Sequence, residues 1–296
     1  MDRLEGKKDI IGLFLKNGIM LTPEEAGALD EKNYMQVLEK KLSENKKDGA
    51  EVYTPKTGRV SCEDFIKGCG RRFEFLRGLL LKKTDAVSIN KGKKVFSEAT
   101  IIGRIKSSTS RGFVLEDITG ETEVVSDSMD IKTGDVMGFR GFFRDNSFFP
   151  NQTMWPDIPL ESSPKPVHMK ITLTSKMKEG MPGTIICPGA MKADNIITGF
   201  SRIGTIKISR HGRELFVLAY APVKETTEEE AIRILKKRTL PDEGATDNVI
   251  EDVPGIFWLF GNGKNWTRNY RGVVIISTDA DSFAEYDGDE VVFGNL

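Results

Sequence analysis

Alternating apolar and polar positions mark the stretch from Ile101 to Pro159. Ile101, Gly103 and Ile105 alternate with Ile102, Arg104 and Lys106. This alternation is typical of a strand with two unlike faces. Further strands are predicted at 113–117, 122–126 and 136–140, with turns at Arg111-Gly112, Thr119-Gly120 and Gly134-Asp135. The pattern is a meander of short strands with glycines at the bends.

Such a meander predicts a small Greek-key barrel of the OB type over residues 95–160. Its strands carry five cations, which are Arg104, Lys106, Arg111, Arg140 and Arg144. Phe113 and four later phenylalanines are interleaved with them. Base stacking on aromatic rings beside a cationic groove is how such barrels hold single strands, so these five cations and Phe113 are the candidate DNA-binding residues. In the alternative interpretation the phenylalanines are core and the cations lie on solvated strand faces.

Helical periodicity comes before the barrel. Residues 1–45 predict a small helical unit, in which Ile10, Leu13 and Phe14 share a face and Thr22-Pro23-Glu24-Glu25 begins a second helix with a capping box. Tyr34, Val37, Leu38 and Leu42 mark a third helix. This unit is either a packing module or a binding module. Residues 46–94 are expected to be a linker, including Lys46 to Gly49, followed by a helix from Asp64 to Lys82.

Composition narrows the class of protein. The 296 residues are enough for two or three domains, and the net charge of −1 gives no overall attraction to nucleic acid, so any DNA contact requires a local patch. The charged N-terminus has no apolar signal core and the apolar runs are short, which predicts an intracellular protein without membrane segments. Three irregularly spaced cysteines argue against a disulfide framework, and Cys62 and Cys69 have no nearby histidine that would suggest zinc.

Two motifs resemble one family. Leu115-Glu116-Asp117-Ile118-Thr119-Gly120-Glu121, followed by Trp155-Pro156-Asp157-Ile158-Pro159, resembles the barrel and barrel exit of the small subunit of archaeal family-D DNA polymerase. The resemblance implies an OB barrel followed by a calcineurin-like phosphoesterase α/β sandwich, here residues 161–296. Segments 165–171, 183–189, 229–238, 253–257 and 270–276 resemble successive elements of that domain. The implied fold class is α+β and multidomain.

The metal-binding motifs of that family are missing. The chain has two histidines, His168 and His211, and both are interpreted as structural or solvated. The family's ligand motifs would fall at 174–177, 189–192, 220–222 and 257–263, where this sequence has apolar, small or cationic residues. The scattered acids Asp194, Asp242, Glu243, Asp247, Asp279 and Asp281 do not suggest another site. We therefore expect no catalytic residue, no metal and no cofactor, in a phosphoesterase-like domain that has lost its nuclease site.

The resemblance implies a non-catalytic accessory subunit, or an inactivated paralogue, that scaffolds the large catalytic subunit of the polymerase and contacts DNA. It would be cytoplasmic and associated with the nucleoid. Trp258, Phe260 and Trp266 are the candidate partner-binding residues, and the alternative is that they form the core of their own domain. Two other functions stay open: an active Mn²⁺-dependent 3′-to-5′ exonuclease subunit, and a free-standing protein that binds single-stranded DNA.

Overall fold

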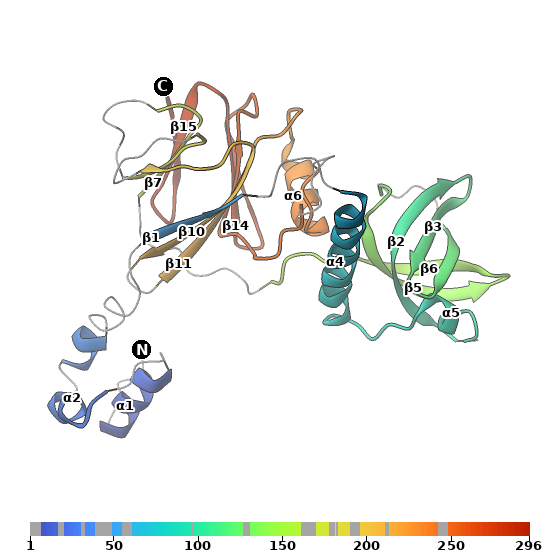
Figure 1. The fold of residues 1–296 in the computed structure, drawn as a ribbon, viewed down its shortest axis with the longest axis horizontal. Coiled ribbons are helices and arrows are strands. Elements are labelled where there is room, and N and C mark those ends of the chain that lie inside the picture. Colours follow the sequence, from blue (N-terminus) through green and yellow to red (C-terminus); the bar gives the residue numbers. More distant parts are fainter. Residues whose placement is uncertain are drawn as a thin grey trace. The chain divides into compact units, whose positions relative to one another are not determined.

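The fold was examined in a computed structural model. It describes residues 7–16, 21–30, 33–38, 49–54, 61–95, 97–126, 131–160, 170–177, 181, 183–189, 196–210, 213–241 and 248–296. The chain is mixed α+β and rich in strands, as predicted, and it forms two compact units (Figure 1). The first unit comprises Met1–Thr54, Ser163–Glu225 and Pro254–Leu296, and the second comprises Pro55–Ser162 and Thr226–Val253.

The N-terminal helices follow the predicted pattern. In α1 (Lys7–Lys16), Ile10 and Phe14 are buried against Leu29 and Leu38. Helix α2 (Pro23–Ala28) has the predicted capping box, in which Thr22 Oγ1 accepts from the Glu25 amide at 3.2 Å and Glu25 Oε2 accepts from the Thr22 amide at 2.9 Å. Residues 34–38 are helical too. Asn17-Gly18 also predicts the end of the first helix, and it lies outside the described residues.

The first unit is built on two sheets. The larger has the order β1-β10-β11-β12-β14-β13 and the smaller has the order β16-β15-β7-β8-β9 (Figure 1). The larger sheet consists of β1 (Gly49–Tyr53), β10 (Ile203–Arg210), β11 (Arg213–Tyr220), β12 (Ile256–Phe260), β13 (Trp266–Tyr270) and β14 (Val273–Thr278). The smaller consists of β7 (Ile171–Thr174), β8 (Thr184–Ile186), β9 (Ile196–Ile197), β15 (Ser282–Tyr286) and β16 (Val291–Asn295).

Both sheets contribute to one apolar core. Leu173 and Ala284 from the smaller sheet pack in the same cluster as Val217, Trp258 and Ile276 from the larger sheet. Strands β11, β12 and β14 run parallel to one another, and so do β7, β8 and β9. Each sheet thus has a run of parallel strands whose carboxyl ends meet at one edge.

Strand β1 corrects the prediction of a linker that reaches Gly49. Gly49 begins a five-residue strand that pairs antiparallel with β10, where Val52 lies opposite Ile206. Only Val52 packs partly on the core, so the segment has too little apolar periodicity to be predicted as a strand. Its pairing partner lies more than 150 residues further along the chain.

The second unit contains a closed barrel with the strand order β2-β3-β4-β6-β5 (Figure 1). Its strands are β2 (Ala99–Thr109), β3 (Gly112–Asp117), β4 (Gly120–Val125), β5 (Val136–Arg144) and β6 (Ser147–Met154). Neighbouring pairs are antiparallel except β4 and β6, which close the barrel as a short parallel pair at Val124 and Phe148. The interior is filled by apolar side chains that include Ile101, Leu115 and Phe139.

In the described part of the second unit, the helices beside the barrel strands are α4 (Cys62–Leu81), α5 (Ile89–Gly92) and α6 (Glu228–Lys237). The predicted helix from Asp64 to Lys82 is confirmed as α4, whose Leu76 and Leu80 pack against Ile102 and Val136 of the barrel. Helix α6 was predicted as part of domain 161–296, but residues 226–253 group with the barrel.

Contacts with the barrel exit hold α6 in the second unit. The Asp157 amide donates to the Lys236 carbonyl at 2.8 Å, and Lys237 Nζ lies 5.2 Å from the centre of the Trp155 ring. Lys237 also forms an ion pair of 2.5 Å with Asp135, and both side chains are largely buried. The Trp155-to-Pro159 motif therefore serves as a packing surface for a segment that lies about 80 residues later in the sequence.

Candidate functional site

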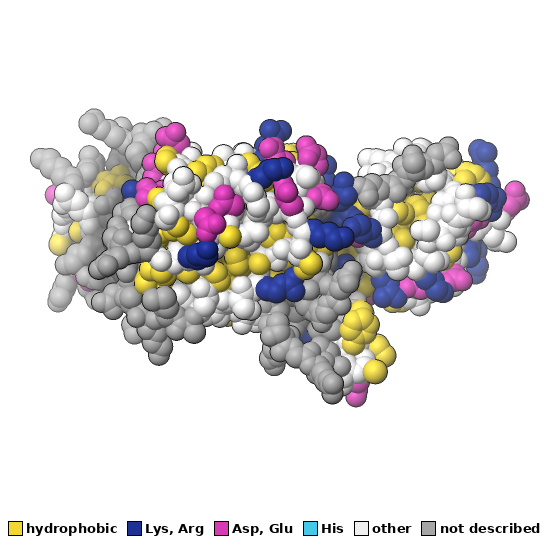
Figure 2. Space-filling view, turned by 90° about the horizontal axis from the view of Figure 1, so that it is seen from above, with side chains coloured by type: hydrophobic (Ala, Val, Ile, Leu, Met, Phe, Trp, Pro, Cys, Tyr) yellow, Lys and Arg dark blue, Asp and Glu magenta, His cyan; other side chains and the backbone are white. Residues whose placement is uncertain are grey.

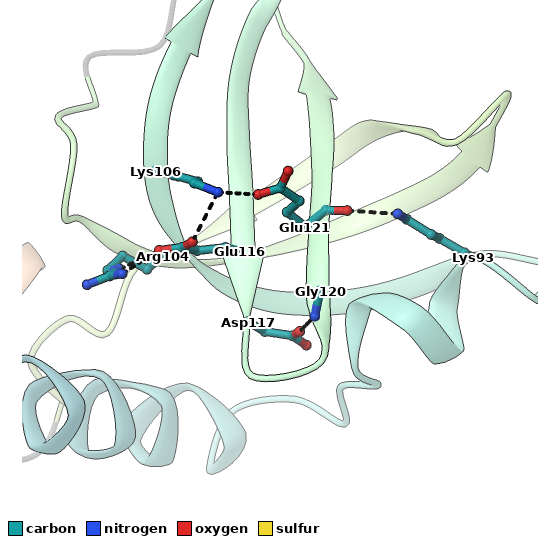
Figure 3. Close-up of polar contacts among 7 residues, drawn as sticks. All are labelled: Lys93, Arg104, Lys106, Glu116, Asp117, Gly120 and Glu121. Atoms are coloured by element: carbon teal, nitrogen blue, oxygen red, sulfur yellow. Dashed lines mark hydrogen bonds and ion pairs between the residues drawn. The ribbon is translucent and has the colours of Figure 1, made fainter.

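The two cations of β2 that were predicted to bind DNA are paired with carboxylates of the same barrel. Arg104 Nε donates to Glu116 Oε1 at 2.9 Å (Figure 3). Lys106 lies between Glu116, at 3.9 Å, and Glu121, to which it donates a hydrogen bond. The bond from Lys106 lowers the pKa of Glu121, and the same contact raises the pKa of Lys106.

The next two cations are paired in the same way. Arg111, at the β2–β3 turn, forms an ion pair with Glu123 of β4. Arg140 of β5 donates to Glu98 at 2.6 Å, and Asn151 donates to the other oxygen of that carboxylate at 2.9 Å. These bonds, that of Asn151 foremost, lower the pKa of Glu98.

On the face formed by β2, β3 and β4, three cations therefore meet three glutamates. Figure 2 likewise shows basic and acidic side chains interspersed over the surface it displays. A phosphate approaching Arg104, Lys106 or Arg111 would have to compete with a carboxylate already in place. Since binding of nucleic acid depends on neutralising phosphates, this face is poorly suited to bind DNA tightly.

The turn between β3 and β4 explains the sequence pattern that suggested the family. Asp117 Oδ1 accepts from the Thr119 amide and hydroxyl, both at 2.7 Å, and from the Gly120 amide at 3.0 Å. Asp117 Oδ2 accepts from the Ile89 amide at 2.9 Å, at the first residue of α5. One carboxylate thus holds its own turn, where Figure 3 shows the bond from Gly120, and also the start of a helix that comes 28 residues earlier.

We expect Asp117→Ala to lower the free energy of unfolding by about 2–3 kcal/mol, because three backbone amides and a hydroxyl lose a charged acceptor. Urea unfolding followed by far-UV circular dichroism measures the effect. Asp117→Asn is the matched control, since it keeps one acceptor oxygen and should lie between Ala and the parent. An unchanged unfolding midpoint for Asp117→Ala would contradict this role.

Phe113 was predicted to stack on bases, and that prediction is wrong. Its side chain is 2% exposed and packs 5.4 Å, centre to centre, from the ring of Phe139 inside the barrel. The position alternates with outward-facing Val114, so the pleat of β3 directs Phe113 into the core. The alternative interpretation, that this phenylalanine is core, is the correct one.

The β5–β6 hairpin carries the aromatic groups that are exposed. Phe142 and Phe149 are directly opposite each other and are 41% and 39% exposed, whereas the next pair, Phe143 and Phe148, faces inward with ring centres 4.9 Å apart. Arg144, the sixth residue predicted to bind DNA, is exposed and makes no ion pair with another described residue. The structure thus separates one exposed aromatic pair from the core phenylalanines.

The predicted partner-binding residues divide into two groups. Trp258 and Phe260 are buried on β12, at 0% and 6% exposure, so their prediction as exposed docking groups is wrong. They pack with Phe200 in an aromatic cluster, because β12 is covered on the face toward the smaller sheet. Trp266 is half-buried on β13, an edge strand of the larger sheet.

Hydrogen-bonded neutral groups fill part of the sandwich edge where the family's metal ligands would be expected. The Trp258 indole N–H donates to Thr278 Oγ1 at 3.0 Å. Asn262 donates to Ser277 Oγ at 2.9 Å, and Ser277 donates onward to the Lys264 carbonyl at 2.7 Å. All these side chains except that of Lys264 are buried.

The loop after β7 carries a cation, Lys176. Thr174, at the end of β7, donates to the Lys176 carbonyl at 2.5 Å, and Lys176 Nζ pairs with Asp281 at 2.6 Å. A dinuclear metal centre requires several converging carboxylates and histidines, and an ammonium group would repel the ions. The residues at 174–177 and 257–263 therefore do not fit two metals. Within the described part of the chain, no three His, Cys, Asp or Glu side chains converge in a way that could hold a metal.

Some predictions fall outside the described residues. These are His168, His211, the segment 190–192, Asp194, Asp242, Glu243 and Asp247. None of the helices that the structure describes is long and apolar enough to cross a membrane. A comparison of the sequence with protein-family models and with curated proteins finds no match.

The thiol of Cys187, just after β8, provides a test of the sandwich. It is buried, and burial raises its pKa, whereas Cys62 is exposed at the start of α4. Because the thiolate is the reactive form, we expect iodoacetamide at pH 8 to modify Cys62 well before Cys187 in the native protein, and both at similar rates in urea. Peptide mass spectrometry measures the order. Equal rates in the native protein would mean that the Cys187 thiol, at the carboxyl end of β8, is accessible to the reagent.

Proposed function

We propose that this protein is a non-catalytic accessory subunit of a DNA polymerase of the family-D type, which binds the large catalytic subunit and contacts DNA. The observation that carries the proposal is the combination of two folds in one chain. The same chain contains a closed five-stranded barrel and a two-sheet sandwich in which the positions of the family's metal ligands are held by Trp258, Asn262, Lys176 and their hydrogen-bonded neighbours.

The assignment of the barrel to the OB type belongs to this proposal. It is supported by the strand order, in which the fifth strand lies between the third and the fourth, and by the short parallel pair β4–β6 that closes the barrel. OB barrels are five-stranded Greek-key barrels, and many of them bind oligonucleotides.

The phosphoesterase-like assignment rests on the sandwich. Each of its two sheets contains three parallel strands, and active sites of open sheets gather where the carboxyl ends of such strands meet. Here the loops after β7 and β12 supply a lysine and hydrogen-bonded neutral groups. A phosphoesterase-like fold that lacks the catalytic groups favours a scaffolding role over hydrolysis.

The exonuclease alternative is tested by incubating the full chain with a 3′-labelled single-stranded oligonucleotide and Mn²⁺. We expect no release of nucleotide above that of a buffer control, because the described residues at the sandwich edge provide no metal ligand set. Release that EDTA abolishes would restore the exonuclease assignment and overturn the non-catalytic one.

Trp266 is the predicted docking residue that remains at the surface. Because edge strands and half-buried aromatic side chains are common at interfaces, we expect Trp266→Ala to reduce co-purification with the large subunit by at least tenfold while the far-UV spectrum is unchanged. Phe65→Ala, which removes an exposed aromatic side chain from α4, is a control that should assemble normally. Full assembly of the Trp266 variant would move the docking site elsewhere.

A further inference from the structure

The β5–β6 hairpin has an unusual arrangement of aromatic side chains. Its sequence reads Phe142-Phe143-Arg144-Asp145-Asn146-Ser147-Phe148-Phe149, and both turn residues, Asp145 and Asn146, have positive φ angles of 48° and 62°. Two successive left-handed residues make the tight turn that suits the twist of a hairpin. The two strands are therefore in a fixed register, and the inner and outer phenylalanine pairs are each set directly opposite one another.

The outer pair is not needed to fill the barrel. Phe148 is fully buried and Phe143 packs on the core, so the inner pair supplies the apolar contact. Phe142 and Phe149 turn a large part of their rings to solvent, and neither belongs to an apolar cluster of the described residues. The Cβ atoms of directly opposite residues on paired strands lie about 5 Å apart, so the two exposed side chains lie on the same face of the hairpin.

Cations flank this surface. Arg140, Phe142 and Arg144 follow one another at every second position and are exposed, as expected for one face of a strand. Helix α5 packs against the other side of the hairpin, since a Cβ on Gly92 would lie 2.7 Å from the ring of the inward-facing Phe143. The outer side, which carries Arg140, Phe142 and Arg144, is left exposed.

The charge balance distinguishes this surface from the β2–β3–β4 face. The nearby carboxylates are those of Asp145, in the hairpin turn, and of Glu98. Glu98 already accepts hydrogen bonds from Arg140 and Asn151. Arg144 remains without a carboxylate partner among the described residues. A negatively charged chain with flat, stacking groups would complement both the rings and the cations.

We propose that the outer face of the β5–β6 hairpin binds single-stranded nucleic acid, with bases stacked on Phe142 and Phe149 and the backbone running past Arg144. Stacking on aromatic rings tolerates any base sequence, so the site discriminates single strands from duplexes and not one sequence from another. The inference rests on the proposed function and deepens it, because it assigns the DNA contact to this surface and away from Arg104, Lys106 and Arg111.

The test measures binding of the full chain to a fluorescent dT oligonucleotide by anisotropy at low salt. We expect the double variant Phe142→Leu with Phe149→Leu to bind on the order of tenfold or more weakly, because leucine keeps the apolar contact and removes the stacking ring. Phe142→Tyr with Phe149→Tyr keeps both rings and should bind like the parent. Arg144→Ala should weaken binding and reduce its dependence on salt.

The control on the other face is Arg104→Ala with Lys106→Ala, which we expect to leave affinity within about twofold because those cations are already paired. Full affinity in the leucine variant would overturn the proposal and leave a protein as the occupant of the hairpin. So would a larger loss in the Arg104 and Lys106 variant, or no binding by the parent chain. Co-purification of the leucine variant with the large subunit is scored separately, so a failed hairpin site is distinguished from a failed subunit assignment.

Discussion

Replacing Trp258 by alanine is expected to lower the free energy of unfolding by about 4 kcal/mol, the range found when large buried aromatic side chains are truncated. The indole is fully buried between the two sheets and packs 5.0 Å, centre to centre, from the ring of Phe260. Its loss leaves a cavity that the surrounding strands, held in register on both sides of β12, can close only in part. Urea unfolding followed by far-UV circular dichroism measures the change.

Two controls separate the contributions of Trp258. Trp258→Phe keeps most of the packing and loses the hydrogen bond to Thr278, so a loss of about 1–2 kcal/mol is expected. Thr278→Val removes the acceptor and leaves the buried indole N–H unpaired, at a similar cost. A Trp258→Ala variant as stable as the parent but unable to assemble would show that the indole is a docking group after all.

Arg238→Ala is the second substitution with a large expected effect, a loss of about 3 kcal/mol. Arg238 is 2% exposed, and its guanidinium donates to the carbonyls of Ile250 and Glu251 at 2.8 and 2.5 Å. Burial lowers the pKa of the guanidinium, and the nearby carboxylates of Asp252 and Asp157 act in the opposite direction. Truncation would leave two backbone acceptors unpaired, while the bond from the Ile250 amide to the Arg238 carbonyl would keep segment 248–251 in place.

Glycine at the same position separates the side chain from the backbone. Arg238 ends α6 in the left-handed region with a φ of 54°, which costs an L-residue about 1 kcal/mol relative to glycine. Arg238→Gly should therefore be about 1 kcal/mol more stable than Arg238→Ala, though still less stable than the parent. If Arg238→Ala and the parent unfold at the same urea concentration, the bonds from the guanidinium to Ile250 and Glu251 do not stabilise the fold.

Local signals in the sequence predicted much of the fold. The capping box at Thr22 and the apolar face of α4 depend on residues three or four positions apart, and both are present. Strand β1 and the grouping of α6 with the barrel depend on partners far along the chain, such as Ile206 for Val52. No periodicity within a short window contains that information.

The candidate site was harder to predict because it depends on which face each side chain occupies. Arginine and glutamate spaced twelve residues apart, as Arg104 and Glu116 are, become partners only when β2 and β3 pair in one register. Trp258 was expected at the surface because aromatic residues dominate interfaces, yet they also dominate cores. One signal was available: the symmetrical run from Phe142 to Phe149 around two turn-forming residues predicts one inner and one outer aromatic pair.

The most direct test of the central claim is co-expression of the tagged full chain with the large subunit of a family-D polymerase from the same genome, followed by size-exclusion chromatography with light scattering. We predict one stable complex containing both chains that extends a primer and, with Mn²⁺ but without nucleotides, releases no nucleotide whose release depends on the small chain. Separate elution of the two chains would contradict the accessory-subunit assignment, and nucleotide release that requires the small chain would contradict its being non-catalytic.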